Sequence, residues 1–164
     1  MKRSRHNLSY GHKTTCDNGE LIPLAAVEVL PGDTFVGRAQ ALIRVTPTIR
    51  PLMHRVEARI HHFFVPNRIL WDGWEDHITN KSAGTIPTIT GGAHSEGTLQ
   101  DYLGIYDDAS TNLNALPFRA YNTIFNVYYR DDDLVSEVSV DSESIQKVAW
   151  PKDYFTTART SPRS

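Results

Sequence analysis

Histidine and carboxylate side chains are concentrated in one short stretch of the sequence, at His54, Glu57, His61 and His62. Such side chains can bind a metal ion, as in a cupin-like jelly-roll enzyme. The stretch also alternates apolar and polar residues, which predicts a strand, and on a strand His61 and His62 point to opposite faces. Glu57 and His61 share a face but are about 13 Å apart at roughly 3.3 Å per residue. A metal site would need ligands from other strands, so we expect no metal and no other cofactor.

The sequence also lacks the other arrangements that carry catalysis. Cys16 is the only cysteine, so it cannot form an internal disulfide, and no neighbouring base would activate its thiol. Gly91 and Gly92 are not followed by the lysine and helix start of a phosphate-binding loop. The acidic run at residues 131–133 is more typical of a solvated helix end than of a cation site. We therefore expect no catalytic residues and no enzyme, and a reducing compartment is the default.

Basic residues are concentrated in the first 13 positions, which hold four lysines and arginines, two histidines and no acidic residue. Clustered cations on a flexible tether are sufficient to neutralise phosphates, and a tyrosine in the same segment could stack on a base. The alternative is a solvated terminus without a ligand. The net charge of −2 excludes the chain as a whole from the polyanion-binding proteins. The candidate nucleic-acid-binding residues are Lys2, Arg3, Arg5, Tyr10 and Lys13.

Two segments, residues 34–45 and residues 53–65, have the period-two alternation of half-buried strands. No helical pattern separates them, which favours an antiparallel pair. A proline-glycine-aspartate turn at residues 31–33 precedes the first segment. Weaker strand patterns cover residues 21–30 and residues 134–149. These segments predict a β-rich framework at both ends of the chain.

Helical patterns lie between these strand regions. Residues 70–78 could form a short helix, and Thr98 with Asp101 makes a capping box that would open another, with a glycine shortly after its end. Residues 116–130 give the clearest helix, because apolar residues recur there at spacings of three and four and a proline occupies the first turn. Residues 79–97 hold four glycines and predict an irregular surface loop.

Large aromatic residues on the helical segments need cover, which either the chain's own core or a neighbouring subunit could supply. The sequence leaves both alternatives open. The candidate subunit-interface residues are Trp71, Trp74, Phe118, Tyr121, Phe125, Tyr128 and Tyr129. A self-contained β-sandwich needs about seven strands, and this chain has too few. The sequence therefore predicts a mainly β fold with helical insertions, completed by further C-terminal chain or by neighbouring subunits.

Several blocks of the sequence, taken in order, resemble the major capsid protein of microviruses, of the gokushovirus-like type. The blocks are HNLS at 6–9, CDNGELIP at 16–23, EVLPGDTF at 28–35, RIHHFFVPNR at 59–68, WDGWED at 71–76, ALPFRAYN at 115–122 and DYFTTA at 153–158. They span almost the whole chain and are specific as a set. Residues 159–164 depart from the pattern that the family continues at that point.

The resemblance implies a partial viral jelly roll, the N-terminal portion of an eight-stranded antiparallel β-sandwich with large insertions between its strands. It also implies that the complete family protein is considerably longer. On this basis we expect an N-terminal arm at residues 1–20. Residues 21–164 would be the N-terminal part of the jelly-roll domain, with insertion loops and helices over residues 66–133.

The function implied by the resemblance is that of a structural subunit of an icosahedral phage capsid, which acts by self-association. Its expected partners are other copies of itself, other virion proteins, packaged circular single-stranded DNA and a host surface receptor. No apolar run approaches the roughly 20 residues that span a bilayer, so we expect no membrane association. The expected location is the virion, after assembly in the host cytoplasm. Two alternatives are the cupin-like metal enzyme and a β-sandwich module that binds glycan or single-stranded DNA.

Overall fold

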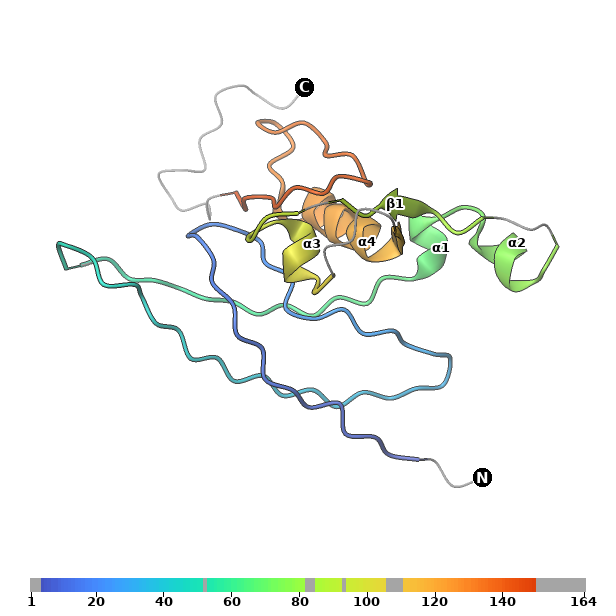
Figure 1. Cartoon of the computed structure of the whole chain (residues 1–164), viewed down its shortest axis with the longest axis horizontal. Helices are drawn as coiled ribbons and strands as arrows, with labels where there is room; N and C mark the ends of the chain where they lie inside the picture. The colour runs from blue at the N-terminus through green and yellow to red at the C-terminus, as the bar shows by residue number, and fades with distance from the viewer. Residues whose placement is uncertain (1–3, 52, 82–84, 93, 106–110, 150–164) are drawn as a thin grey trace. The chain divides into compact units, whose positions relative to one another are not determined.

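The structure, a computed structural model, describes residues 4–51, 53–81, 85–92, 94–105 and 111–149 (Figure 1). The chain divides into two units, the first formed by residues 1–26 and 65–164 and the second by residues 27–64. All helices and strands of the described residues lie in the first unit. None of these helices is long and apolar enough to cross a membrane.

The main helix of the first unit is formed by α4, Leu116–Ile124, which continues directly into the π-helix η1, Phe125–Tyr129. Together they confirm the helix predicted over residues 116–130, with proline in its first turn. The amide of Arg130 donates to the carbonyl of Phe125 at 3.0 Å, a step of five residues that the sequence pattern did not predict. The helix ends just before the acidic run, as expected from the repulsion between carboxylates and a helix C-terminus.

The single helix predicted over residues 70–78 is wrong, because the structure has two shorter ones. Helix α1 covers Asn67–Leu70, and helix α2 covers Trp74–Ile78. Trp71 is extended, with φ −154° and ψ 115°, and so interrupts the helical path. A Cβ at Gly73 would lie 2.7 Å from Nε1 of Trp71, so the indole packs where only glycine leaves room.

Helix α3, Leu99–Tyr102, begins at the predicted cap. The amide of Asp101 donates to Oγ1 of Thr98 at 3.5 Å, and the carboxylate of Asp101 accepts from the amide of Gly97 at 2.9 Å. This confirms the capping role of both side chains. Gly104 ends the helix with a φ of +73°, a conformation that favours glycine.

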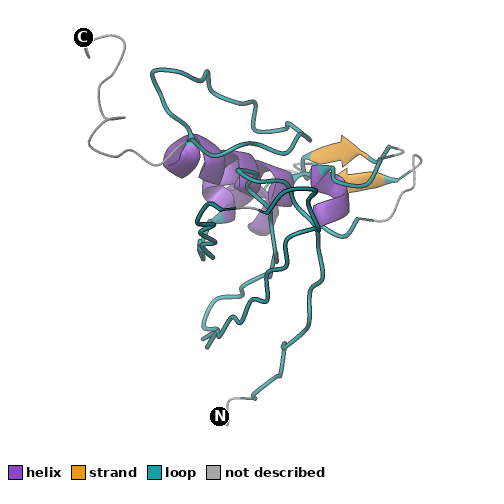
Figure 2. Cartoon of the chain, turned by 90° about the vertical axis from the view of Figure 1, so that its left-hand side faces the viewer, coloured by secondary structure: helices purple, strands orange, loops and turns teal. Residues whose placement is uncertain are grey.

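The only sheet among the described residues is a pair of short antiparallel strands, β1, Thr88–Thr90, and β2, Asn112–Asn114 (Figure 2). Ile89 lies opposite Leu113 in the register. β1 falls inside residues 79–97, where the sequence predicted an irregular loop without a strand, so that prediction is wrong at this point. Three residues with one buried side chain give too short a pattern to be recognised from sequence.

The core of the first unit lies where the sheet, α3 and α4 meet. Its buried members are Ile89, Leu99, Ala115, Phe118 and Tyr121. Partly buried apolar side chains from the N-terminal and C-terminal ends of the described chain pack against them, among them Leu21 and Ile145. The core therefore joins segments that are more than one hundred residues apart in sequence.

The strands predicted over residues 34–45 and 53–65, and their antiparallel pairing, are not present in the structure. The chain of the second unit instead runs outward along the first segment, bends at Ile49 and Arg50, and returns along the second (Figure 1). Neither segment forms a strand. The turn at residues 31–33 is confirmed, because the amide of Asp33 donates to the carbonyl of Leu30 at 3.1 Å. A strand requires a backbone partner as well as a side-chain pattern, and here only the pattern is present.

The weaker strands predicted over residues 21–30 and 134–149 are also wrong as strands. What remains of them is one antiparallel bridge between Glu20 and Lys147. The amide of Leu21 donates to the carbonyl of Gln146, and the amide of Val148 donates to the carbonyl of Gly19, both at 2.9 Å. Within the described residues the fold is thus a small two-stranded sheet with helices, not the mainly β arrangement that the sequence predicted.

Candidate functional site

The aromatic residues that were predicted from the sequence to lie at a subunit interface fall into two groups by their exposure. Phe118, Tyr121 and Phe125 are 0%, 6% and 2% exposed, so the chain's own core covers them. Trp71, Trp74 and Tyr129 are half-buried, and Tyr128 is 65% exposed. Val127 beside it is 67% exposed, and the sequence did not single it out. The outer face of η1 is thus the accessible part of the aromatic helix.

The hydroxyl of Tyr121 connects the two ends of the first unit. It donates to the carbonyl of Leu21 at 2.9 Å and accepts from the amide of Gln146 at 2.8 Å. Burial raises the pKa of Tyr121 to about 12, while the hydrogen bond from Gln146 acts in the opposite direction. A core aromatic side chain therefore fixes the position at which the N-terminal segment leaves the fold.

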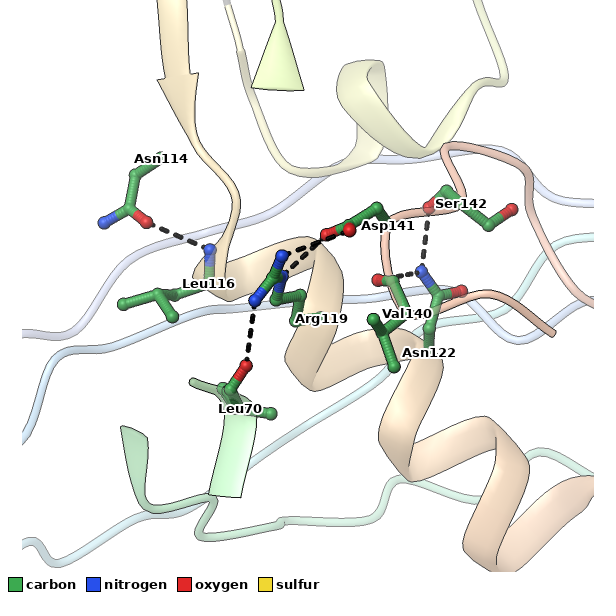
Figure 3. Close-up of polar contacts among 8 residues, drawn as sticks. All are labelled: Leu70, Asn114, Leu116, Arg119, Asn122, Val140, Asp141 and Ser142. Atoms are coloured by element: carbon green, nitrogen blue, oxygen red, sulfur yellow. Dashed lines mark hydrogen bonds and ion pairs between the residues drawn. The ribbon is translucent and has the colours of Figure 1, made fainter. Parts of the chain in front are cut away.

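Arg119 joins three segments on the polar side of α4 (Figure 3). Its guanidinium pairs with both carboxylate oxygens of Asp141, with Nε 2.6 Å from Oδ1 and Nη2 3.1 Å from Oδ2. Its third nitrogen, Nη1, donates to the carbonyl of Leu70 at 3.1 Å. The fork geometry of arginine allows this one side chain to hold together α1, α4 and the loop at residues 138–142, which contains Asp141.

Two asparagines continue this polar row along the helix. The side-chain amide of Asn122 donates to the carbonyls of Val140 and Ser142, at 2.9 and 2.8 Å. Asn126 exchanges two hydrogen bonds with Val138, accepting from its amide at 3.0 Å and donating to its carbonyl at 2.8 Å. The loop at residues 138–142 is therefore attached to α4 and η1 by side chains in place of a strand partner.

This polar row was not predicted from the sequence. The available signal was the spacing of Arg119, Asn122 and Asn126, since positions three and four apart lie on the same side of a helix. Asparagine is also unfavourable in the middle of a helix unless its side chain has a partner. Polar residues at helical spacing within an aromatic helix thus indicate a polar contact with another segment.

The two tryptophans form a small ring cluster with His77. The rings of Trp71 and Trp74 meet edge to face, with centroids 6.4 Å apart. The imidazole of His77 lies 5.3 Å from Trp71 and 6.2 Å from Trp74 between ring centroids. These contacts hold α2 against the segment that links it to α1.

The basic arm is exposed over the part that the structure describes. Arg5, Tyr10 and Lys13 are all exposed, whereas Lys2 and Arg3 lie outside the described residues. The hydroxyl of Tyr10 donates to the carbonyl of Leu24 at 3.2 Å, so its ring is attached at one edge.

Apolar side chains are exposed along most of the second unit. Residues 27–64 carry exposed Val27, Val29, Leu30, Phe35, Val36, Leu42, Ile43, Val45, Ile49, Met53, Val56, Ile60, Phe63 and Phe64. Val36 and Leu42 are 91% and 90% exposed, more than Phe35 or Ile43 on the alternate positions, at 48% and 60%. In residues 34–45 the predicted alternation is therefore present as a difference in exposure between these four residues, although the strand itself is not.

Within the described part of the chain, no three histidine, cysteine, aspartate or glutamate residues come together as a metal site. The four residues considered for a metal enzyme, His54, Glu57, His61 and His62, are exposed positions of the second unit. Cys16 is a free, exposed thiol. The arrangement of the described residues is one of apolar surface and structural hydrogen bonds.

Comparison with known proteins gives a family for this chain. Residues 1–162 match a family described as Capsid protein (F protein). The chain is 36% identical to Capsid protein VP1 of Bdellovibrio phage phiMH2K, over 98% of this chain and 34% of that protein. It is 38% identical to Capsid protein VP1 of Chlamydia phage 1, over 85% of this chain and 26% of that protein. A third relative, Capsid protein VP1 of Spiroplasma virus 4, is 32% identical over 85% of this chain and 28% of its own length. The chain thus spans between a quarter and about a third of these relatives.

Proposed function

Because this chain belongs to the phage capsid protein (F protein) family, matched over residues 1–162, we propose that it acts as a structural subunit of an icosahedral phage capsid. Its activity is self-association with other copies and with other virion proteins. The relatives in this comparison carry the name capsid protein, which supports the same role here. The role is structural and requires no catalytic group.

The observation that carries this proposal is the exposed apolar surface of residues 27–64. Ile49 is fully exposed, and Phe35 and Ile43, on the side opposite Arg38 and Arg44, are 48% and 60% exposed. Exposed apolar side chains in this number indicate contact with other protein, because their burial contributes about 25 cal/mol per Å². A subunit that buries these side chains only on assembly would be stabilised by contact with its neighbours.

The jelly roll is the fold we propose for the assembled state. In it, residues 34–45 and 53–65 become strands when backbone partners from outside the described residues meet them. The exposure of the first segment supports this, since Phe35 and Ile43 on one side are more covered than Val36 and Leu42 on the other. The helices and loops of residues 66–133 would then be insertions on that framework, and residues 1–20 would be an arm.

The proposed subunit contacts include the outer face of η1 and the tryptophan cluster. Tyr128 is accessible there, and Trp71, Trp74 and Tyr129 keep part of their surface exposed. Rings with one apolar side and one polar end are favoured at such borders. Phe118, Tyr121 and Phe125 would act indirectly, because their burial holds the helix that carries the exposed rings.

The proposed nucleic-acid partner is packaged circular single-stranded DNA, with the basic arm as one contact. The exposed cations Arg5 and Lys13 support this, with Lys2, Arg3 and Tyr10 in the same segment. A host surface receptor is the further partner proposed, with assembly in the host cytoplasm and a final location in the virion.

Electron microscopy of the expressed capsid protein, alone and together with the other virion proteins, tests the self-association role. Closed shells or shell fragments are the expected result. Particles that remain monomeric in every combination, at concentrations where the folded state is stable, would overturn the proposal. Analytical ultracentrifugation of the same samples would distinguish ordered oligomers from aggregates.

A further inference from the structure

The second unit carries a positive balance of charge in a chain whose net charge is −2. Residues 27–64 hold no lysine and five arginines, at Arg38, Arg44, Arg50, Arg55 and Arg59. Their acidic residues are three, Glu28, Asp33 and Glu57. All eight side chains belong to exposed residues. The cations of the chain are therefore not confined to the N-terminal arm.

Contacts along residues 55–63 place cations and aromatic rings on one side of the returning segment. Glu57 pairs with Arg55 at 2.9 Å and with Arg59 at 3.0 Å, so these alternate residues share a side. The rings of His61 and Phe63 meet edge to face, with centroids 6.2 Å apart, which continues the same row. The guanidinium side chains remain 85% and 68% exposed in spite of their pairing.

The outgoing segment also carries cations on one side, without an acidic neighbour and without a ring on that side. Arg38 and Arg44 alternate with the highly exposed Val36 and Leu42 on the more accessible side. Among the residues that the structure describes, neither of these arginines has an ion-pair partner. Side chains on one face of an extended chain recur about every 6.6 Å, so three such steps, about 20 Å, separate Arg38 from Arg44.

This combination matches single-stranded nucleic acid better than a folded protein surface. Guanidinium groups bind phosphates through a planar fork, and a ring such as that of Phe63 offers a stacking surface that accepts any base. A protein partner would need carboxylates placed opposite these arginines. A nucleic-acid strand supplies one phosphate for every nucleotide, whatever its sequence.

We infer that the arginine-bearing faces of residues 34–45 and 53–63 form a second contact for single-stranded nucleic acid, separate from the N-terminal arm. Arg38 and Arg44 neutralise phosphates, and Arg55 and Arg59 do so to a lesser degree because Glu57 competes for them. The inference rests on the proposed function, since it names the residues that meet the packaged strand.

Fluorescence anisotropy with a labelled single-stranded DNA oligomer, over a series of salt concentrations, tests the inference on the whole chain. The plot of log affinity against log salt should lose about 0.7 of slope for each arginine that Arg38→Gln and Arg44→Gln remove. The change Glu57→Gln should instead strengthen binding, because it releases two guanidinium groups. Arg68→Gln, at an exposed arginine of α1, is the matched control and should lose less slope than either variant.

The combined variant Arg5→Gln with Lys13→Gln separates the arm from the second contact, and its loss of slope should add to that of the first pair. Absence of DNA binding by the parent chain, or an unchanged slope in the Arg38 and Arg44 variants, would overturn the inference. If the Arg38 and Arg44 variants no longer formed shells in electron micrographs but kept the salt slope of the parent, the inference would also be overturned. The face would then contact protein and not DNA. A failure of the parent to form shells would count against the proposed function instead.

Discussion

The hydroxyl of Tyr121 is a buried group with two backbone partners, from segments at opposite ends of the chain. We expect Tyr121→Phe to lower the free energy of unfolding by about 1–3 kcal/mol, because the carbonyl of Leu21 and the amide of Gln146 lose their partner. Chemical denaturation of parent and variant measures this. A variant as stable as the parent would mean that water replaces the hydroxyl without cost.

The same residue gives a pH dependence with a defined sign. Its pKa in the folded chain is raised to about 12, above the value of about 10 for an unfolded tyrosine. The folded state therefore favours the protonated hydroxyl, and this stability is fully present below pH 10 and lost as the pH rises from about 10 to about 12. The free energy of unfolding, measured across this pH range, should fall more steeply for the parent than for Tyr121→Phe.

Gly73 is a second residue whose identity the structure explains. We expect Gly73→Ala to cost about 1–3 kcal/mol, because the added Cβ would lie 2.7 Å from Nε1 of Trp71 and displace the indole. Tryptophan fluorescence and near-ultraviolet circular dichroism would report the displacement. Gly92→Ala is the matched control, since a Cβ there meets nothing within 4 Å, and equal effects of the two changes would contradict the packing argument.

At the scale of elements, the loop at residues 138–142 depends on the helix beside it. Asn126→Ala should remove the protection of the Val138 amide from hydrogen exchange, because that amide donates to Asn126 at 3.0 Å. The expected loss of stability is about 1 kcal/mol, since the backbone donor and acceptor of the half-buried Val138 lose their partner. Asn112→Ala, at an exposed position of β2, should leave Val138 protected. Protection that persists in Asn126→Ala would show that the loop is held by its other contacts alone.

The π-helical end of the aromatic helix has a consequence at this scale too. Inserting one residue into the helical repeat rotates the side chains that follow, and Val127 and Tyr128 face outward here while Asn126 remains buried. A regular α-helical repeat was the basis on which the sequence grouped Tyr128 with Phe118 and Tyr121. Its different exposure follows from the change in helical step.

For the whole molecule, the apolar surface of the second unit should govern association. We expect the paired change Phe35→Asn and Ile43→Asn, on the side opposite Arg38 and Arg44, to shift sedimentation-velocity profiles toward monomer, because the apolar side chains that association would bury are removed. Gln40→Asn, at the polar position between them, is the control and should associate as the parent does. Association that is undiminished in the double variant would place the subunit contact elsewhere.

The sequence by itself determined the local elements whose signals lie within a few residues. The cap formed by Thr98 and Asp101, the turn before Phe35 and the helix from Leu116 are of this kind. Each depends on propensity and on hydrogen bonds between near neighbours, so it is encoded where it occurs. The ordered motif blocks likewise predicted the capsid family that the match over residues 1–162 confirmed.

The tertiary structure alone decided which segments meet. It brought Leu21 and Gln146 to the hydroxyl of Tyr121, joined Asp141 to Arg119, and put Phe118 and Phe125 inside while Tyr128 stayed outside. It also left residues 34–45 without a strand partner, although their alternation is that of a strand. Long-range pairing depends on which surfaces are free to be buried together, and a pattern of alternating residues states only that a partner is needed.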